Sequence, residues 1–507
     1  MNRKIEKECE SSCEYILPDY MGDIKKLLAS RARVIPTGKF VDGDSLLVSG
    51  SVEYEILYAD SENKLTSVVT GSDYEMTVAI DGESYADAGE VYSVGMPLVR
   101  VTGPRKLSVR SAVNARLTVN DGKKEEIGGD AFSDGRELET LLSEVEYERC
   151  VFGKSHEREY AEEIARLREV KCEELEIVSS HARIRISDTH ADTDCVSLKG
   201  EITVEGIIRN GDTPPFVVKK SFPFEERVDT VGAASGMFTT AEGYITSLSC
   251  SALAEGEECV IVANLITEYA TSAYESYTEQ VITDAYLKEY GTDNSYGTLR
   301  YQKVVERLEK DLDLCFKISR SDIGCTELRE IMGMSIDLRS VSAAQSGNTL
   351  RFEGDAVICG VACELNENGK AVFLPIKQQT KFEADVNLTC QIPEEAVFDY
   401  TLTPTDISVS VDGECVFVDC RATVRASVSQ PKEITYLRAC TVREDERYEL
   451  GRSRITVYYP TGEETLFSVA KRFHTTPARL AEDNGISESV FADASTSVLG
   501  KKRIIIR

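Results

Sequence analysis

The chain has 507 residues, which exceeds one domain and predicts about three to four. Asp and Glu outnumber Lys and Arg by 87 to 58, and the resulting charge of −29 speaks against a general nucleic-acid binder and against adhesion to anionic lipid. Hydrophobic residues at 42% and charged residues at 29% are typical of chains that bury cores. The composition therefore predicts an acidic multidomain protein and names no reaction.

The N-terminal text MNRKIEKECESSCEYIL carries charges throughout and lacks the apolar core of a secretory signal. No stretch approaches the roughly 20 apolar residues that cross a bilayer. We therefore expect an intracellular chain without membrane insertion, whose 15 Cys are mostly buried thiols, with later oxidative cross-linking left open. Cys9 and Cys13 form a Cys-x-x-x-Cys pair, as do Cys359 and Cys363, but neither has the further ligands of a zinc site. We expect no metal and no cofactor.

One sequence pattern occurs three times. Each copy places a Gly ahead of an alternating apolar run: Gly50 in LLVSGSVEYEILY (46–58), Gly200 in VSLKGEITVEGIIR (196–209) and Gly354 in LRFEGDAVICGVACEL (350–365). Gly200 follows Gly50 by 150 residues, and Gly354 follows Gly200 by 154. A second alternating stretch follows each copy, at 106–119, 259–270 and 416–428. Two matched landmarks at near-constant spacing predict three copies of one domain.

Alternation with a period of two predicts half-buried antiparallel strands. Clusters of Gly, Asn, Asp and Pro divide these runs, for example at 42–45, 210–215, 366–370 and 411–414. Short strands separated by such turns predict a β-sandwich for each copy. We therefore expect a mainly β fold with sandwich-like repeats at 15–133, 173–284 and 317–440.

The segments between the copies are predicted to be helical linkers, at 134–172 and 285–316. Their most helix-like parts are 137–150, 157–170 and 286–314. In the last of these, Val304, Leu308 and Leu312 recur at roughly helical spacing among Glu and Lys. We expect these helices to pack on the neighbouring sandwich, with spacers and oligomerisation seams as the alternatives.

The last segment, 451–507, differs in charge from the rest. It carries nine Lys or Arg against six Asp or Glu, a net of +3, which leaves −32 for the remainder of the chain. Its pattern predicts a strand at 453–459, helices at 464–474 and 476–485, and a strand at 502–507. A basic module joined to an acidic body favours a docking role, because complementary charge speeds and orients association.

This segment resembles a LysM module. The text GEETLFSVAKRFHTTPARLAEDNGI matches the family pattern at eight positions: Gly462, Thr465, Leu466, Val469, Ala470, Phe473, Leu480 and Asn484. One extra residue lies between Gly462 and Thr465, Phe467 replaces the usual Trp, and the last strand ends in IIIR. The resemblance implies a small βααβ domain at 451–507, with a shallow glycan-binding groove between 461–465 and 484–487.

The three copies resemble SPOCS domains, and the opening LPDYMGDIKKLLASRARV (17–34) is similar to the lead-in of that family. Repeated SPOCS domains followed by one LysM domain resemble the SipL-like spore coat morphogenetic proteins. This implies a non-enzymatic scaffold in the mother-cell cytoplasm at the forespore surface. Its implied partners are SpoIVA, the ATPase of the coat's basement layer, and other coat proteins. The alternative is a peptidoglycan or N-acetyl-sugar-binding protein of the spore cortex or wall.

No phosphate-binding loop, dinucleotide turn, zinc-protease helix or nucleophile elbow is present in the sequence. No catalytic residue is therefore selected, and an enzyme hidden in a sandwich is the third hypothesis. We expect charge reversal at Lys471 or Arg472, or truncation of Leu466 or Ile486, to weaken docking by the C-terminal module. Leu466 could equally be a core residue. The expected binding residues are Gly462, Glu463, Glu464, Thr465, Leu466, Lys471, Arg472, Asn484, Gly485 and Ile486.

Overall fold

The computed structural model describes residues 2–80, 88–120, 131, 135–448, 455–461, 464–486 and 503–507. The described residues form mainly β-strands in several antiparallel sheets, which confirms the predicted mainly β class. The chain divides into two compact units. The first contains residues 1–123, 149–275 and 304–429, and the second contains 124–148, 276–303 and 430–507.

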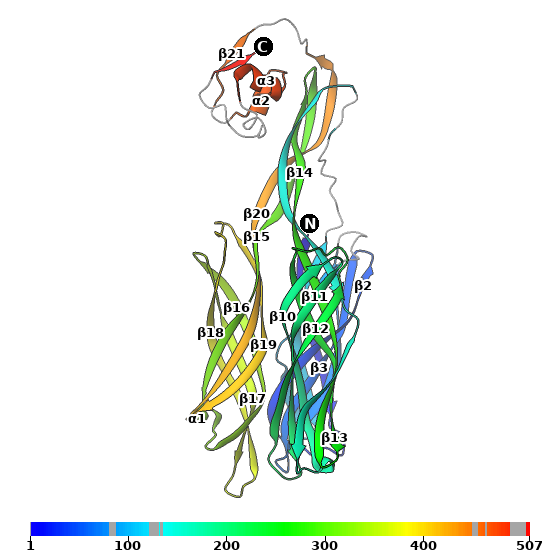
Figure 1. Cartoon of the computed structure of the whole chain (residues 1–507), viewed down its shortest axis with the longest axis vertical. Helices are drawn as coiled ribbons and strands as arrows, with labels where there is room; N and C mark the ends of the chain where they lie inside the picture. The colour runs from blue at the N-terminus through cyan, green and yellow to red at the C-terminus, as the bar shows by residue number, and fades with distance from the viewer. Residues whose placement is uncertain are drawn as a thin grey trace. The chain divides into compact units, whose positions relative to one another are not determined.

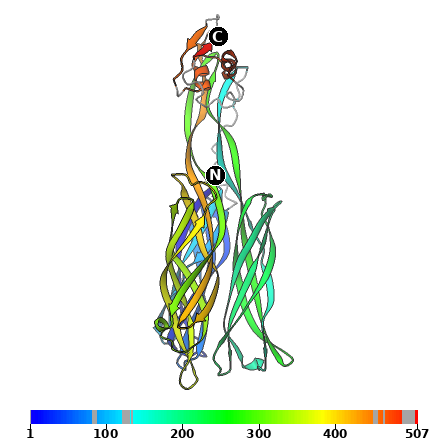
Figure 2. The ribbon, with the colours of Figure 1, turned by 60° about the vertical axis from the view of Figure 1, so that its left-hand side comes forward.

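Within the first unit, three strand-built bodies lie side by side (Figure 1, Figure 2). The first body contains β1 (Asn2–Ile16), β2 (Ile24–Asp42), β3 (Ser45–Asp60), β4 (Leu65–Ala79), β5 (Ala88–Val94), β6 (Leu98–Gly103) and β7 (Lys106–Asn120). The second contains β9 (Arg158–Arg168), the 3₁₀ turn η1 (Cys172–Glu174), β10 (Leu175–Asp192), β11 (Cys195–Asn210), β12 (Phe216–Asp229), β13 (Phe238–Glu255) and most of β14 (Glu258–Leu287), with β8 (Leu138–Lys154) on the same sheet. The third contains the second half of β15 (Tyr290–Ser319), α1 (Arg320–Ile323), β16 (Leu328–Ser346), β17 (Thr349–Leu365), β18 (Ala371–Asn387), β19 (Val397–Asp412) and the first part of β20 (Cys415–Arg447).

The three bodies share one strand order. Each begins with a strand that precedes a three-stranded meander: β2-β3-β4, β10-β11-β12 or β16-β17-β18. The last long strand, β7, β14 or β20, then pairs with the strand that precedes it in the chain (β6, β13 or β19) and with an opening strand of the same body (β1, β9 or β15). In each body the two sheets enclose an apolar core.

The recurring glycines have one structural explanation. Gly50, Gly200 and Gly354 each pair across the meander with an aromatic residue, which is Tyr74, Phe224 or Phe382 respectively. A side chain on any of the three glycines would collide with that ring and with a backbone carbonyl of the other neighbouring strand. That neighbouring strand has a register shift beside the glycine in every body. Glycine therefore admits an aromatic ring over the central strand beside a β-bulge.

The expected helical linkers are wrong. Residues 137–150 lie largely in β8, 157–170 largely in β9, and 286–314 in the end of β14 and in β15. Val304, Leu308 and Leu312 recur every four residues, and four is also a multiple of the strand period of two. In β15 the alternation continues through buried Leu314, Phe316 and Ile318. These segments supply edge strands, because pairing with β14 and β20 outweighs the helix propensity of Glu, Leu and Lys.

The three central strands also meet one another. Leu57, Ile207 and Val361 each lie seven residues after the recurring glycine, and all three belong to one buried cluster. Met332 and Phe373 belong to the same cluster. Polar contacts cross between the bodies around it: Asn63 Nδ2 donates to Ala371 O at 2.8 Å, Arg209 Nη1 to Leu65 O at 2.8 Å, and Arg183 Nη2 to Met334 O at 2.7 Å. The three bodies thus share one core.

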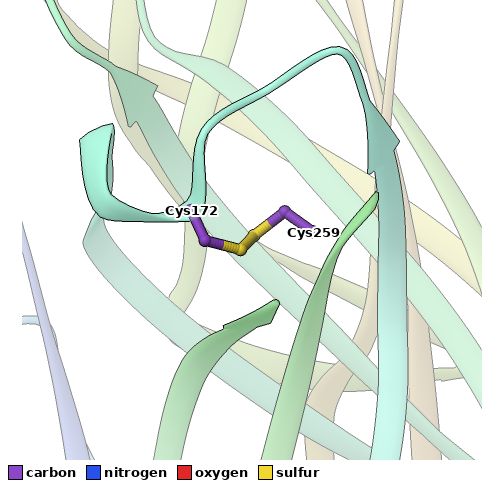
Figure 3. Close-up of a disulfide and its surroundings, with 2 residues drawn as sticks. All are labelled: Cys172 and Cys259. Carbon is purple, nitrogen blue, oxygen red and sulfur yellow. A yellow bond between two sulfur atoms is a disulfide. The ribbon is translucent and has the colours of Figure 1, made fainter. Parts of the chain in front are cut away.

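A disulfide joins Cys172 to Cys259 in the second body (Figure 3). The expectation of thiols throughout is therefore wrong for this pair, because η1 places Cys172 directly against the start of β14. Cys359, Cys363 and Cys420 are free and buried in strands, as expected of small apolar fillers. Among the described residues, no helix combines the length and apolar character needed to span a membrane.

The second unit contains the ends of the long strands β8, β14, β15 and β20 and the C-terminal module. Val145, Val281, Leu299 and Tyr436, one from each of those strands, form a small core. The module contains β21 (Thr456–Tyr458), α2 (Leu466–Arg472), α3 (Pro477–Asn484) and β22 (Ile504–Ile506), with β21 antiparallel to β22. The described part of the module has the predicted order of strand, two helices and strand.

The first prediction concerns the recurring glycine. Gly50→Ala should destabilise the first body by about 1–3 kcal/mol, because the added Cβ would lie 2.5 Å from Ile35 O and from the Tyr74 hydroxyl oxygen. Gly38→Ala in β2 is the matched control, since its Cβ would meet nothing nearer than Ser49 Oγ at 3.9 Å. Urea unfolding followed by tyrosine fluorescence measures both. Equal stability of the two variants would contradict the packing explanation.

The second prediction concerns the disulfide. Cys172→Ser should lower the free energy of unfolding by about 2–5 kcal/mol in non-reducing buffer, since the bond joins residues 87 apart. In excess dithiothreitol the variant and the parent chain should unfold alike. Cys250→Ser, at a partly buried free thiol of the same body, should change little in either buffer. A loss for Cys172→Ser that persists under reduction would show that the bond contributes nothing.

Candidate functional site

The residues at the helix ends of the C-terminal module explain why its two helices form. Thr465 caps α2 in a reciprocal capping box, in which its hydroxyl accepts from Ser468 N and Ser468 Oγ accepts from Thr465 N. Thr476 caps α3 ahead of Pro477, whose missing N–H costs nothing at the first helical position. Gly485 ends α3 with a φ of 63°, a left-handed conformation that glycine adopts freely.

Several of the expected binding residues instead hold the module together. Leu466 is fully buried in the module's core, and Ile486 packs against the same core. Asn484 Nδ2 donates to Leu480 O and Ile505 O, and its Oδ1 accepts from Ile505 N at 2.6 Å, so it fastens α3 to β22. Gly485 is the helix cap already described. Gly462 and Glu463 lie outside the described residues.

Two of the expected charged residues form one cluster beside β21. The Glu464 carboxylate accepts from Thr461 N and from the Tyr458 hydroxyl, and Arg472 Nη1 lies 2.7 Å from it. Burial alone would raise the pKa of Glu464, but these hydrogen bonds and the Arg472 charge lower it below its usual value. Arg472 also lies over the Tyr458 ring, 5.6 Å from its centroid. This cluster closes the turn between β21 and α2.

The face of α2 that includes Lys471 packs on strands of the same unit. Lys471 Nζ pairs with the Asp284 carboxylate of β14 at 2.6 Å. The Tyr286 ring packs edge-on against Phe467 at 5.1 Å, and its hydroxyl donates to Thr475 O at 2.7 Å. Lys471, expected to contact a partner, is thus engaged by a carboxylate of its own chain.

His474 lies just beyond α2 and contacts the same surface. Its ring stacks on Tyr448 at 3.6 Å between centroids. Burial lowers its pKa, and Glu446 only partly opposes that shift, so the environment favours the neutral ring. The residue therefore packs as an aromatic ring.

A different face of the module is exposed. Ile455, Val457 and Tyr459 lie on one side of β21 and are 67%, 50% and 70% exposed. Val457 pairs with Ile505 of β22, and the exposed Arg503 and Arg507 flank that strand. We call Ile455, Val457, Tyr459, Arg503 and Arg507 the outer face. The outer face was not predicted from the sequence, although Ile455, Val457 and Tyr459 occupy alternate positions in RITVYY and so share one side of a strand.

The described residues contain no group of three or more His, Cys, Asp or Glu side chains arranged to hold a metal ion. No protein-family model matches the chain, and no curated protein does. A solved structure described as lipopolysaccharide binding protein aligns with 52% of this chain and 91% of its own, at 8% identity and a TM-score of 0.08, and this likeness carries no argument.

The third prediction tests the contact between α2 and β14. Lys471→Glu would place two carboxylates together, and we expect hydrogen exchange in α2 to become about fivefold faster, which corresponds to about 1 kcal/mol. The double variant Lys471→Glu with Asp284→Lys should restore the slow exchange. Arg479→Glu, on the exposed side of α3, is the control of equal charge change. If the double variant exchanges as fast as the single one, the ion pair does not hold the module.

Proposed function

We propose that this chain is a non-enzymatic spore coat assembly scaffold of the SipL-like type, with three SPOCS-like sandwich repeats and a LysM-type module at 451–507. The shared strand order of the three bodies and their recurring glycine–aromatic pairs support the repeat. The strand, helix, helix, strand order and the Thr465 and Asn484 contacts support the module. Repeated rigid bodies with a docking module suit an assembly role.

One observation carries this proposal, and it is the outer face. Exposed Ile455, Val457 and Tyr459 form an apolar row, and Arg503 and Arg507 supply positive charge at its edge. Interfaces commonly combine an apolar centre with a charged rim. A partner with an apolar patch bordered by carboxylates fits this face. Under the proposal, that partner is SpoIVA, the basement-layer ATPase, at the forespore surface in the mother cell.

Sugar binding in the cortex or wall is the alternative outcome. In the resemblance, the sugar groove lies between 461–465 and 484–487, and Gly462, Glu463 and residue 487 of that groove fall outside the described residues. Thr465 and Asn484 are already committed to the helix cap and to β22. These contacts favour a structural role for both residues over sugar recognition.

The fourth prediction separates the two functions. In the full chain, Val457→Asp should abolish capture of the basement-layer ATPase, because it puts a charge at the centre of the apolar row. Val69→Asp in β4 is the matched control, at a residue with a similar exposure of 54%. Co-precipitation from sporulating cells and binding of chitin oligomers are measured for both variants. ATPase capture lost only in Val457→Asp supports the scaffold; sugar binding by the parent chain without ATPase capture contradicts it.

A further inference from the structure

A hollow of about 1240 Å³ lies inside the first unit, where the three bodies face one another. Strands β2, β10 and β16 each contribute to its lining, with Arg31 and Arg33, His181 and Arg183, and Ser335 and Asp337 respectively. These residues occupy equivalent positions. Arg31, His181 and Ser335 pair with residues five after the recurring glycine, and Arg33, Arg183 and Asp337 pair with residues three after it. Arg31, His181 and Ser335 therefore form one layer of polar side chains, and Arg33, Arg183 and Asp337 form a second.

Several hydrogen-bonding groups in these layers lack partners. Arg31 is 9% exposed; it binds Glu55 and the Ser179 hydroxyl, and its Nη1 has no partner among the described residues. Arg33 pairs with Glu53 through Nη2, whereas its buried Nε has no described partner. The Ser335 hydroxyl is also buried and unpartnered among the described residues. Leaving a buried donor unpaired costs free energy, so these groups favour a bound acceptor.

Arg183 adds a charge that has no ion-pair partner among the described residues. Its Nη2 donates to Met334 O, and no carboxylate in the described part of the chain lies within ion-pair distance of its guanidinium. Burial lowers its pKa, and attraction to Glu205 and Asp406 from beyond ion-pair distance only partly opposes that shift. Burial and the charges of Arg31, Arg183 and Arg33 together lower the pKa of His181. Three guanidinium groups therefore lie close enough to act on His181 in a chain whose net charge is −29.

The carboxylates that line the hollow are mostly committed elsewhere. Asp337 accepts from Arg339 and from Met96 N, Asp399 pairs with Lys4 and Arg116, Glu6 with Arg116, and Glu242 with Arg425. None of these carboxylates forms an ion pair with Arg183, which Glu205 and Asp406 attract only from a longer distance. A guanidinium group binds tetrahedral oxyanions particularly well, because its donors match their oxygen spacing.

We propose that the hollow binds one small tetrahedral oxyanion of the phosphate or sulfate class, held by Arg31, Arg33, Arg183 and Ser335. Each of the three bodies contributes to the site, so it is complete only when they are assembled. Occupancy would then stabilise the contact between the bodies, because an anion that binds only the assembled state raises its stability.

The fifth prediction is a thermal-unfolding experiment on the full chain, with inorganic phosphate compared with chloride at equal ionic strength. Phosphate should raise the Tm saturably in the parent chain. In Arg183→Gln the apparent affinity should fall about tenfold or more, because a charge-assisted contact is lost. In chloride the Tm of this variant should be unchanged or higher, because a half-buried charge without an ion-pair partner is removed.

Arg351→Gln is the matched control. It removes the same charge from an exposed pair with Asp385 and should keep the full phosphate response. A parent chain that shows no saturable response, or an equal loss in both variants, would overturn the site. So would a Tm drop for Arg183→Gln that is the same in both buffers, since that is a purely structural role.

Crystals of the full chain soaked in selenate give a readout that does not depend on a variant folding. An anomalous peak beside Arg183 and Ser335 supports the site. Ordered water alone at that position overturns it.

Discussion

The burial of both faces of β3, β11 and β17 is the constraint on which the first unit depends. One face of each strand packs in the core of its own body, through residues such as Tyr54, Val204 and Ile358. The other face, through Leu57, Ile207 and Val361, packs in the core that the three bodies share. Exposing that second face would return large apolar side chains to water, at about 25 cal/mol for every Å². The three bodies are therefore not independently folded domains, and a change at one central strand affects the other two.

This constraint also explains how much of the fold the sequence could predict. The alternating first halves of the three runs predicted half-buried strands correctly, because only one face is covered there. In the second halves, continuous burial from Tyr54 to Asp60 and from Ala356 to Cys363 reports a second buried face, but a short apolar run does not say what covers it. The recurring glycines were visible as a pattern. Their reason, an aromatic ring on the next strand, required the strand register.

The wrong helices have a related cause. A spacing of four residues suits a helical face and also one face of a strand, so Val304, Leu308 and Leu312 could not decide between them. The segment is a strand because β15 pairs with the edge of β20 that β19 leaves open. In the C-terminal module the reverse holds, because capping residues act locally. The helices predicted at 464–474 and 476–485 therefore agree with α2 and α3 to within two residues at each end. Capping residues predict helix ends from neighbouring residues alone, whereas strand pairing depends on segments that are distant in the sequence.

Charge complementarity indicated that the basic segment would contact carboxylates, but it did not say on which molecule those carboxylates lie. The contrast between a basic segment and an acidic body indicated attraction, and Lys471 does bind a carboxylate. That carboxylate, Asp284, belongs to the same chain, where no loss of translational freedom opposes the contact. An intramolecular acid at short range therefore outcompetes a partner for Lys471. Arg503 and Arg507, two cations that stay exposed, flank β22. This strand pairs with β21, whose apolar side chains are also exposed. The surface available to another molecule is the one whose charged groups form no ion pair within the chain.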